Sequence, residues 1–488
     1  MIKKNNKQRV IEEINENKIE NIFNIIPNIS DKVIDYNEEN FGITNIIDEI
    51  FEDKRSYESE ISSSLLVLSG VQSRMKQQFS ISELPLALTS KKVIENLNLN
   101  ISYDYKEGLL KEPNIRALLG KYEQEDKNEI KFNNYFISFF NSFNKSYLKK
   151  TNTECNIHIL DCSILDVNLS NENYEGSTVT VKNGEKLRGY KIGLLKGITP
   201  NGGVIEEIIM STAKEHDLNM SKDMILNTEY LKPGDYLLED RGFIDIDLFK
   251  ELNFKGVKII IPAKKNMEIY NSAIISAREN NNWIKHPNQK RNGQDITLVT
   301  GLEYAWLSDK DKTKKPSKLE LKYNINCCVI RFEKSKNKDV LTDEEIISTE
   351  GEYAYACIIT NDTSLSCVEI IRLYEMRTEI EEDFRQLKDF WGLNAYKSTK
   401  YHVISFVILV SLIGYNFYQI YKESEEGKEY IGKSLIVEER HGLYIVKGVR
   451  TAIVTEHYFG IFEQDELLDL YADLDKQKRQ LLKKHLVI

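Results

Sequence analysis

The sequence predicts an α/β protein in which a mixed sheet is covered by helices. Two observations support this fold class: apolar runs of strand length begin near residue 155, and they then alternate with helical patterns. The expected strands lie at 156–167, 188–198, 202–212, 234–240 and 257–264, and the expected helices at 216–227 and 245–256. Three strands followed by helix, strand, helix and strand are typical of a layered α/β core.

The remaining segments suggest how the chain is divided. Residues 1–150 are expected to form a helical N-terminal DNA-binding domain, in which 80–101 fit a small DNA-binding unit or a plain helical hairpin equally well. We expect the core to comprise 151–264 and 351–421, interrupted by a β-rich insertion at 265–350. Residues 422–488 are expected to form a C-terminal tail that contacts a partner chain.

Composition excludes few classes of protein. The 488 residues are 41% hydrophobic and 29% charged, which is an ordinary globular balance. The net charge of -10 is unusual for a nucleic-acid-binding protein, but the charge is unevenly placed: residues 10 to 60 are rich in Glu and Asp, while Lys clusters elsewhere. The six cysteines form no CxxC pair and have no histidine at zinc-finger spacing, so reduced thiols in the cytoplasm are expected.

One apolar segment has two possible interpretations. The run from Val403 to Tyr418 contains no charged residue. A membrane-spanning helix needs about 20 apolar residues, and this run is shorter and includes Ser405, Ser411 and Asn416. These polar residues favour a buried core helix and no membrane partner.

The most informative segment is the helix pattern YEMRTEIEEDFRQLK. At about 100° per residue, Tyr374, Arg377, Glu381 and Lys388 fall within an arc of about 60° on one continuous helix. A carboxylate on this face is therefore flanked by two cations and a phenol. From the residues alone, a structural role and a functional role for this face are equally plausible.

Two aspartates follow strongly apolar runs where strands are expected. Asp161 lies in HILDCSIL and Asp240 in YLLEDRGF, and a buried carboxylate is costly unless it is paired or bound to a metal ion. Asp166 competes with Asp161, and Asp245 competes with Asp240. For any one of these residues a turn or a helix cap is as plausible as a metal ligand.

Three carboxylates from two strands and a helix suit phosphoryl transfer. Mg²⁺ prefers oxygen ligands, and two ions about 4 Å apart can stabilise the attacking and leaving oxygens of an in-line displacement. Arginine and lysine nearby can hold phosphates.

The spacing Tyr-x2-Arg-x3-Glu-x6-Lys resembles the signature of bacterial insertion-sequence transposases of the Tyr-Arg-Glu-Lys group, the insertion-sequence-four type. The runs LEDRGF and LDCSIL resemble the contexts of that family's two catalytic aspartates. The resemblance covers residues 155 to 420 and implies an RNase H-like core whose catalytic and metal-binding residues are Asp161, Asp240 and Glu381. It implies Mg²⁺ as the cofactor, with Mn²⁺ able to substitute.

The same resemblance implies the partners. Tyr374, Arg377 and Lys388 would contact DNA phosphates near the cleaved end. The protein's partner would be double-stranded DNA, at the transposon's inverted repeats and at the target. Arg241, directly after Asp240, is also expected to bind DNA. A homodimer would hold the paired ends in a bacterial, nucleoid-associated complex, where the element is cut out and pasted elsewhere.

Trp306 in the expected insertion has two interpretations. It lies beside the lysine-rich segment 310–315, so it could stack on a base flipped from the DNA end. A core tryptophan in a β-hairpin is the plainer alternative.

Two other functions stay open at the level of sequence. One is an RNase H-like nuclease that hydrolyses nucleic acid without joining strands. The other is an inactive, transposase-derived DNA-binding protein. The Tyr-Arg-Lys row disfavours the first, and the intact set of three acids disfavours the second.

Overall fold

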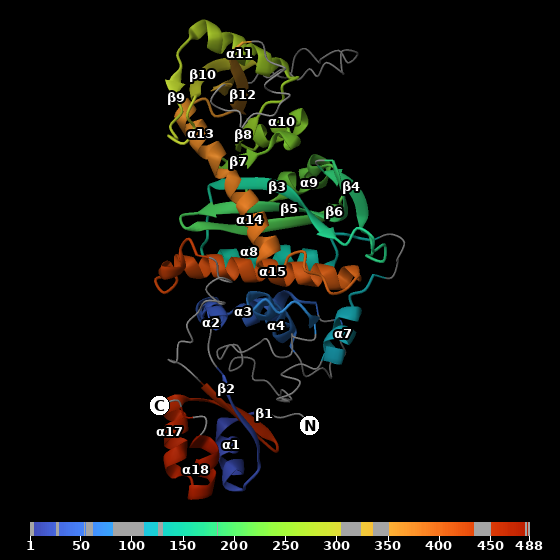
Figure 1. Ribbon diagram of the computed structural model, residues 1–488, viewed down its shortest axis with the longest axis vertical. Coiled ribbons are helices and arrows are strands. Elements are labelled where there is room, and N and C mark those ends of the chain that lie inside the picture. The colour runs from blue at the N-terminus through green and yellow to red at the C-terminus, as the bar shows by residue number, and fades with distance from the viewer. Residues whose placement is uncertain are drawn as a thin grey trace.

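A computed structural model describes residues 4–25, 29–52, 54, 62–81, 112–124, 130–182, 184–303, 324–334, 351–433, 450–483 and 486. Figure 1 shows a central sheet with helices packed against it and a smaller unit at the end where both chain termini lie. The protein is a mixed α/β protein, as the sequence predicts.

The central sheet has the strand order β4-β5-β3-β7-β8-β12-β11-β10-β9, and β6 also pairs with β5. Strands β3, β7 and β8 are parallel neighbours, and the other pairs are antiparallel. The strands are β3 (Ile157–Val167), β4 (Thr178–Lys182), β5 (Glu185–Thr199), β6 (Gly202–Thr212), β7 (Tyr236–Glu239), β8 (Lys258–Pro262), β9 (Ile284–Lys285), β10 (Gln294–Glu303), β11 (Asn324–Glu333) and β12 (Tyr353–Thr360).

Helices cover both faces of this sheet, and neighbouring residues of a strand face opposite cores. Ile159 and Leu194 belong to one buried cluster, while Leu160 and Leu195 belong to the other. The first core includes helices α2 (Ile29–Phe41), α3 (Ile43–Ile50), α4 (Ser63–Met75), α7 (Glu112–Gly120), α8 (Tyr135–Lys150) and α15 (Tyr401–Glu423). The second includes α9 (Asp217–Asn227), the short 3-10 helix η2 (Arg241–Phe243), α10 (Ile246–Phe254) and α11 (Glu268–Asn280).

Helix α15 contains the apolar run that raised the question of a membrane. It is long and apolar enough to cross a bilayer, and its most apolar 18-residue window is entirely buried. The polar residues in it have hydrogen-bond partners inside the protein: Ser411 Oγ donates to the carbonyl of Val407 in the same helix at 2.9 Å, and Asn416 Nδ2 donates to Asn144 Oδ1 on α8 at 2.8 Å. The packing is that of a core helix.

The segment expected to carry Tyr374, Arg377, Glu381 and Lys388 on one continuous helix forms two helices. Helix α13 (Cys367–Met376) ends where α14 (Thr378–Asp389) begins, and Arg377 lies between them with φ -57° and ψ -29°. The Arg377 amide donates to the carbonyl of Tyr374 at 3.0 Å, three residues back, so the chain tightens here without leaving the helical region. The prediction of a continuous helix was wrong at this residue, although the axis continues (Figure 1).

The segment 265–350 contains strands, but they extend the central sheet. Strands β9, β10 and β11 follow one another outward from β12. The segment also begins with helix α11, which the sequence analysis did not expect. Trp306 and the lysines of 310–315 lie outside the described residues, as does most of 80–101.

A second sheet joins the two ends of the chain, with the order β1-β14-β13-β2. We call the group of elements around it the terminal unit: β1 (Lys4–Asn5), α1 (Lys7–Asn15), β2 (Ile19–Ile25), β13 (Arg450–Thr455), β14 (Tyr458–Glu463), α17 (Gln464–Asp473) and α18 (Lys476–Lys483). Its core contains Val10, Ile14, Ile453, Phe462, Leu467, Leu470, Leu474 and Leu482. Residues 1–150 therefore include strands, and the first 25 residues pack with the C-terminal segment. A short 3-10 helix, η4 (Lys428–Tyr430), follows α15 in the chain.

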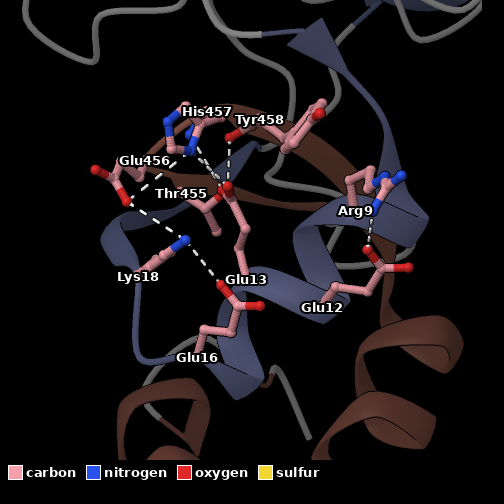
Figure 2. A network of polar contacts seen from close by, with 9 residues as sticks. All are labelled: Arg9, Glu12, Glu13, Glu16, Lys18, Thr455, Glu456, His457 and Tyr458. Atoms are coloured by element: carbon pink, nitrogen blue, oxygen red, sulfur yellow. Dashed lines mark hydrogen bonds and ion pairs between the residues drawn. The ribbon is translucent and has the colours of Figure 1, made fainter.

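A buried carboxylate links α1 to the β13–β14 turn (Figure 2). Glu13 Oε2 accepts a hydrogen bond from the His457 amide nitrogen at 3.1 Å, and Glu13 Oε1 lies 2.7 Å from His457 Nδ1. Burial tends to raise the pKa of Glu13, but hydrogen bonds from Thr455 and His457 outweigh it and the pKa is lowered. Lys18 adds ion pairs to Glu16 at 2.7 Å and to Glu456 at 3.7 Å.

The contact between α4 and α15 gives a test of the packing. A Cβ atom at Gly70 would lie 2.7 Å from Val410 Cγ1 and 3.1 Å from Phe406 Cζ. Gly70→Val is therefore expected to lower the free energy of unfolding by about 1–3 kcal/mol through overpacking. Thermal and urea unfolding would measure the change. Gly120→Val, where nothing lies within 4 Å of the added Cβ, is the matched control and should leave the midpoint nearly unchanged. Equal midpoints for both variants would contradict this packing.

Candidate active site

Parallel pairing of β3 with β7 brings two aspartates side by side. Leu160 pairs with Glu239, and β7 ends there, so Asp161 and Asp240 are the next residues along the two strands. Strand β3 continues to Val167, paired with β5. The two carboxylates therefore lie where β7 leaves the sheet, a position at which α/β proteins commonly bind ligands.

The Asp161 carboxyl group lies in an unusual electrostatic environment. Its side chain is only 17% exposed. Burial raises the pKa of Asp161 to about 6, and the nearby carboxylates of Asp240 and Glu381 add to the rise. The Cys162 amide and the Arg377 guanidinium oppose it. Acidic groups from two strands and a helix thus repel one another at this site.

Arg377 connects the helix to the strand. Its Nη2 donates to Glu381 Oε1 at 2.6 Å, and its Nη1 lies 3.6 Å from Asp161 Oδ2. The guanidinium carbon is 5.8 Å from the centre of the Tyr374 ring. Burial raises the pKa of the Tyr374 phenol; Arg377 opposes this shift, while Asp240 and Glu381 add to it. The structure thus brings Asp161, Asp240, Tyr374, Arg377 and Glu381 together.

Lys388 reaches the same strand about three helical turns after Arg377. Its Nζ donates to Ser163 Oγ at 2.8 Å. Ser163 lies two residues after Asp161 on β3 and so faces the same side of the sheet. Burial lowers the pKa of Lys388, and the charge of Asp166 opposes that shift. The spacing seen in the sequence places this lysine on the site's face.

The structure gives the competing aspartates other partners. Asp245 is the N-cap of α10, where Oδ1 accepts the Leu248 amide at 2.8 Å, and it also pairs with Lys222 at 3.0 Å. Asp166 accepts a hydrogen bond from Asn394 Nδ2 at 3.3 Å. Asp161 and Asp240, in contrast, lie with Glu381.

A cavity of about 580 Å³ opens beside Asp240. It is lined by His216, Asp240, Arg241, Gly242, Lys264, Lys265 and Asn266. Arg241, predicted to bind DNA, is therefore on its wall. Lys264 and Lys265 were missed by the sequence analysis, although they follow β8, the parallel neighbour of β7, and this position could have indicated them.

The donor set suits a divalent cation, although it is not arranged around one here. Within the described part of the chain, no three Asp, Glu, His or Cys side chains converge to hold a metal ion. Carboxylate oxygens are the ligands that hard cations prefer. Arg377 supplies the positive charge between Asp161 and Glu381, so a metal ion would replace it as the partner of these carboxylates.

Comparison with known proteins shows the family of this chain. A family model described as "Transposase DDE domain" matches residues 170–417. The match includes Asp240, Tyr374, Arg377, Glu381 and Lys388, and it begins after Asp161.

Two other comparisons were made. No curated protein matches the chain. Among solved structures, a piggyBac transposase synaptic complex with hairpin DNA, determined by cryo-EM, is similar with a TM-score of 0.41 and 10% identity. That alignment covers 93% of this chain and 85% of the other. Because the matched family region spans just over half of the 488 residues, the chain belongs to the family of DDE transposases.

Proposed function

We propose that this DDE transposase cuts DNA at the ends of its element and joins the freed ends to a target, with Asp161, Asp240 and Glu381 holding the metal ions. The observation that carries the proposal is the position of Asp161 beside Asp240, with Arg377 linking Asp161 to Glu381. A DDE transposase acts on DNA and uses divalent metal ions. We propose Mg²⁺ as the natural ion, with Mn²⁺ as a substitute.

The strand order supports an RNase H-like core. Strands β6, β5 and β3 form an antiparallel meander, and β7 and β8 follow β3 in parallel. The strands β9 to β11 are then an insertion added to one edge of that core. Together with the Tyr-Arg-Glu-Lys spacing, this arrangement supports assignment of the protein to the bacterial transposases of the insertion-sequence-four type.

The protein's own side chains would bind and orient DNA. A bound metal ion would stabilise charge on the phosphate oxygens during displacement. Arg377 has a buried Nε–H without a hydrogen-bond partner in the described structure, and its fork matches a phosphate. Tyr374 and Lys388 lie on the same helix face as Arg377. Lining the cavity, Arg241, Lys264 and Lys265 would hold the phosphate backbone of a DNA strand.

The assembly and location are also proposals. A homodimer would hold two transposon ends and a target in one complex, in the bacterial cytoplasm at the nucleoid. The terminal unit and the segment after α15 are the parts we propose for partner contacts, and residues 29–150 for contacts with the inverted repeats. A nuclease without strand joining and an inactive DNA-binding protein are not favoured by the family match.

Replacing the helix carboxylate tests the ligand set. Glu381→Gln should reduce metal-dependent cleavage of a duplex carrying the element's flanking DNA by at least about 100-fold, because it removes a ligand rather than an outer partner. Glu382→Gln, on the same helix and paired with Arg385, is the matched control. Released 3′-hydroxyl ends would be quantified with Mg²⁺ and with Mn²⁺. Equal cleavage by both variants would exclude Glu381 as a ligand.

Stability without metal gives a test that is independent of activity. Burial raises the pKa of Asp161 to about 6 in the folded protein. The free energy of unfolding should therefore fall as pH rises from about 4 to 6, and it should stay lower above pH 6. Asp161→Asn should therefore stabilise the metal-free protein at pH 8 by about 1–3 kcal/mol while abolishing cleavage. The gain should disappear at pH 4. Loss of stability at pH 8 would show that the Arg377 contact outweighs desolvation.

The cavity beside Asp240 can be tested through salt dependence. Lys264→Gln with Lys265→Gln should lower the slope of log affinity for DNA against log salt by about 1–2, since each phosphate contact releases counterions. The exposed pair Lys149→Gln and Lys150→Gln gives the same change in net charge outside the cavity. Fluorescence anisotropy at several salt concentrations would measure both. An identical loss of slope would assign the effect to net charge alone.

A further inference from the structure

Helix α14 is held on its far side by a buried polar cluster. The Asp383 carboxylate accepts a short hydrogen bond from Lys196 Nζ at one oxygen, and the Tyr415 hydroxyl donates to the other at 2.7 Å. Lys196 Nζ also lies 3.6 Å from Glu379 Oε2. Lys196 is 2% exposed, and Tyr415, on α15, is fully buried. Sheet, α14 and α15 therefore meet at one carboxylate.

The lysine of this cluster lies on the same face of the sheet as the catalytic aspartate. In the ladder between β3 and β5, Lys196 pairs with Ile159, and Leu194 pairs with Asp161. Paired residues share a face, and so do residues two apart on one strand. Asp161 and Lys196 are thus presented by neighbouring strands to the same helix, α14, which crosses both strands in Figure 1.

The helix geometry couples the cluster to Glu381. Glu381 and Asp383 are two residues apart and hence separated by about 200° around the helix axis. Arg377 and Lys388 bond to β3 on one side of α14, while Asp383 bonds to β5 and α15 on the other. A rotation of α14 that moved Glu381 away from Asp161 would break the Asp383 contacts.

The cost of burying these groups argues for a role in position. A buried ion pair is often no more stabilising than apolar residues of similar volume, because both ions lose their hydration. In some proteins such a pair fixes a single arrangement, since displacement leaves a buried charge without its partner. Ile380, Phe384 and Leu387 already supply the apolar contacts of α14.

We infer that Lys196, Asp383 and Tyr415 are positioning residues that set the rotation of α14 and thereby hold Glu381 in place to bind metal. The inference rests on the proposed role of Glu381 as a ligand. None of the three touches the reacting groups. Their effect passes through the backbone of α14.

The test removes both charges while keeping the shape. The double variant Lys196→Met with Asp383→Asn leaves no buried ion uncompensated and retains an oxygen for the Tyr415 hydroxyl. We expect a thermal midpoint close to that of the wild type, faster hydrogen exchange of the amides at 378–389 in the metal-free protein, and at least 10-fold weaker binding of Mn²⁺ measured by calorimetry. Glu382→Gln with Arg385→Gln removes an exposed ion pair from the same helix and should change neither the exchange nor the affinity.

Unchanged exchange together with wild-type Mn²⁺ affinity in the double variant would overturn the inference. If the double variant does not fold, Tyr415→Phe serves instead, because it removes one hydrogen bond and keeps the ring. It should still accelerate exchange in α14 and weaken Mn²⁺ binding about 3-fold, and wild-type values for both would overturn the inference. Glu381→Gln separates the two proposals: if it leaves Mn²⁺ affinity unchanged, the ligand set is wrong, whereas the exchange data still decide whether the cluster fixes α14.

Discussion

The parallel pairing of β3 with β7 is the constraint on which the rest of the site depends. It places Asp161 beside Asp240 at the point where β7 ends. Burial, with added repulsion from Asp240, raises the pKa of Asp161 to about 6. Such an arrangement needs positive charge nearby. Arg377 supplies it from the junction of α13 and α14, and this contact fixes where the third carboxylate lies.

Glu381 lies on the exposed side of α14, and the opposite side of this helix is tightly packed. Its side chain is 55% exposed and has one ion pair, while the far side of α14 packs through Ile380, Phe384 and Leu387 and through the Asp383 cluster. Because α14 is packed on its other side, the Glu381 carboxylate can change its cationic partner without movement of the helix that carries it. Packing behind a functional side chain is what holds it in a defined geometry.

Sequence reasoning found the parts of the protein that local pattern determines. Strands β3, β5, β6, β7 and β8 were predicted because each is a compact apolar run, and the face shared by Tyr374, Glu381 and Lys388 follows from helical spacing. Partners distant in sequence could not be predicted in this way. Strand β2 has little pattern of its own and exists through pairing with β13, more than 400 residues later. The contact of Lys196 with Asp383 likewise depends on how segments meet in space, whereas the capping role of Asp245 is local and was one of the two alternatives that the sequence left open.

The joining of residues 4–25 with residues 450–483 in one sheet has a consequence for biosynthesis. A chain emerging from the ribosome can complete its domains from the N-terminus onward, but α1 and β2 must wait for β13 and β14 before they can bury their apolar side chains. The terminal unit therefore closes last, whatever the state of the catalytic core. Chains that end before β13 would carry an unpaired β2 edge, which can pair with other chains and aggregate.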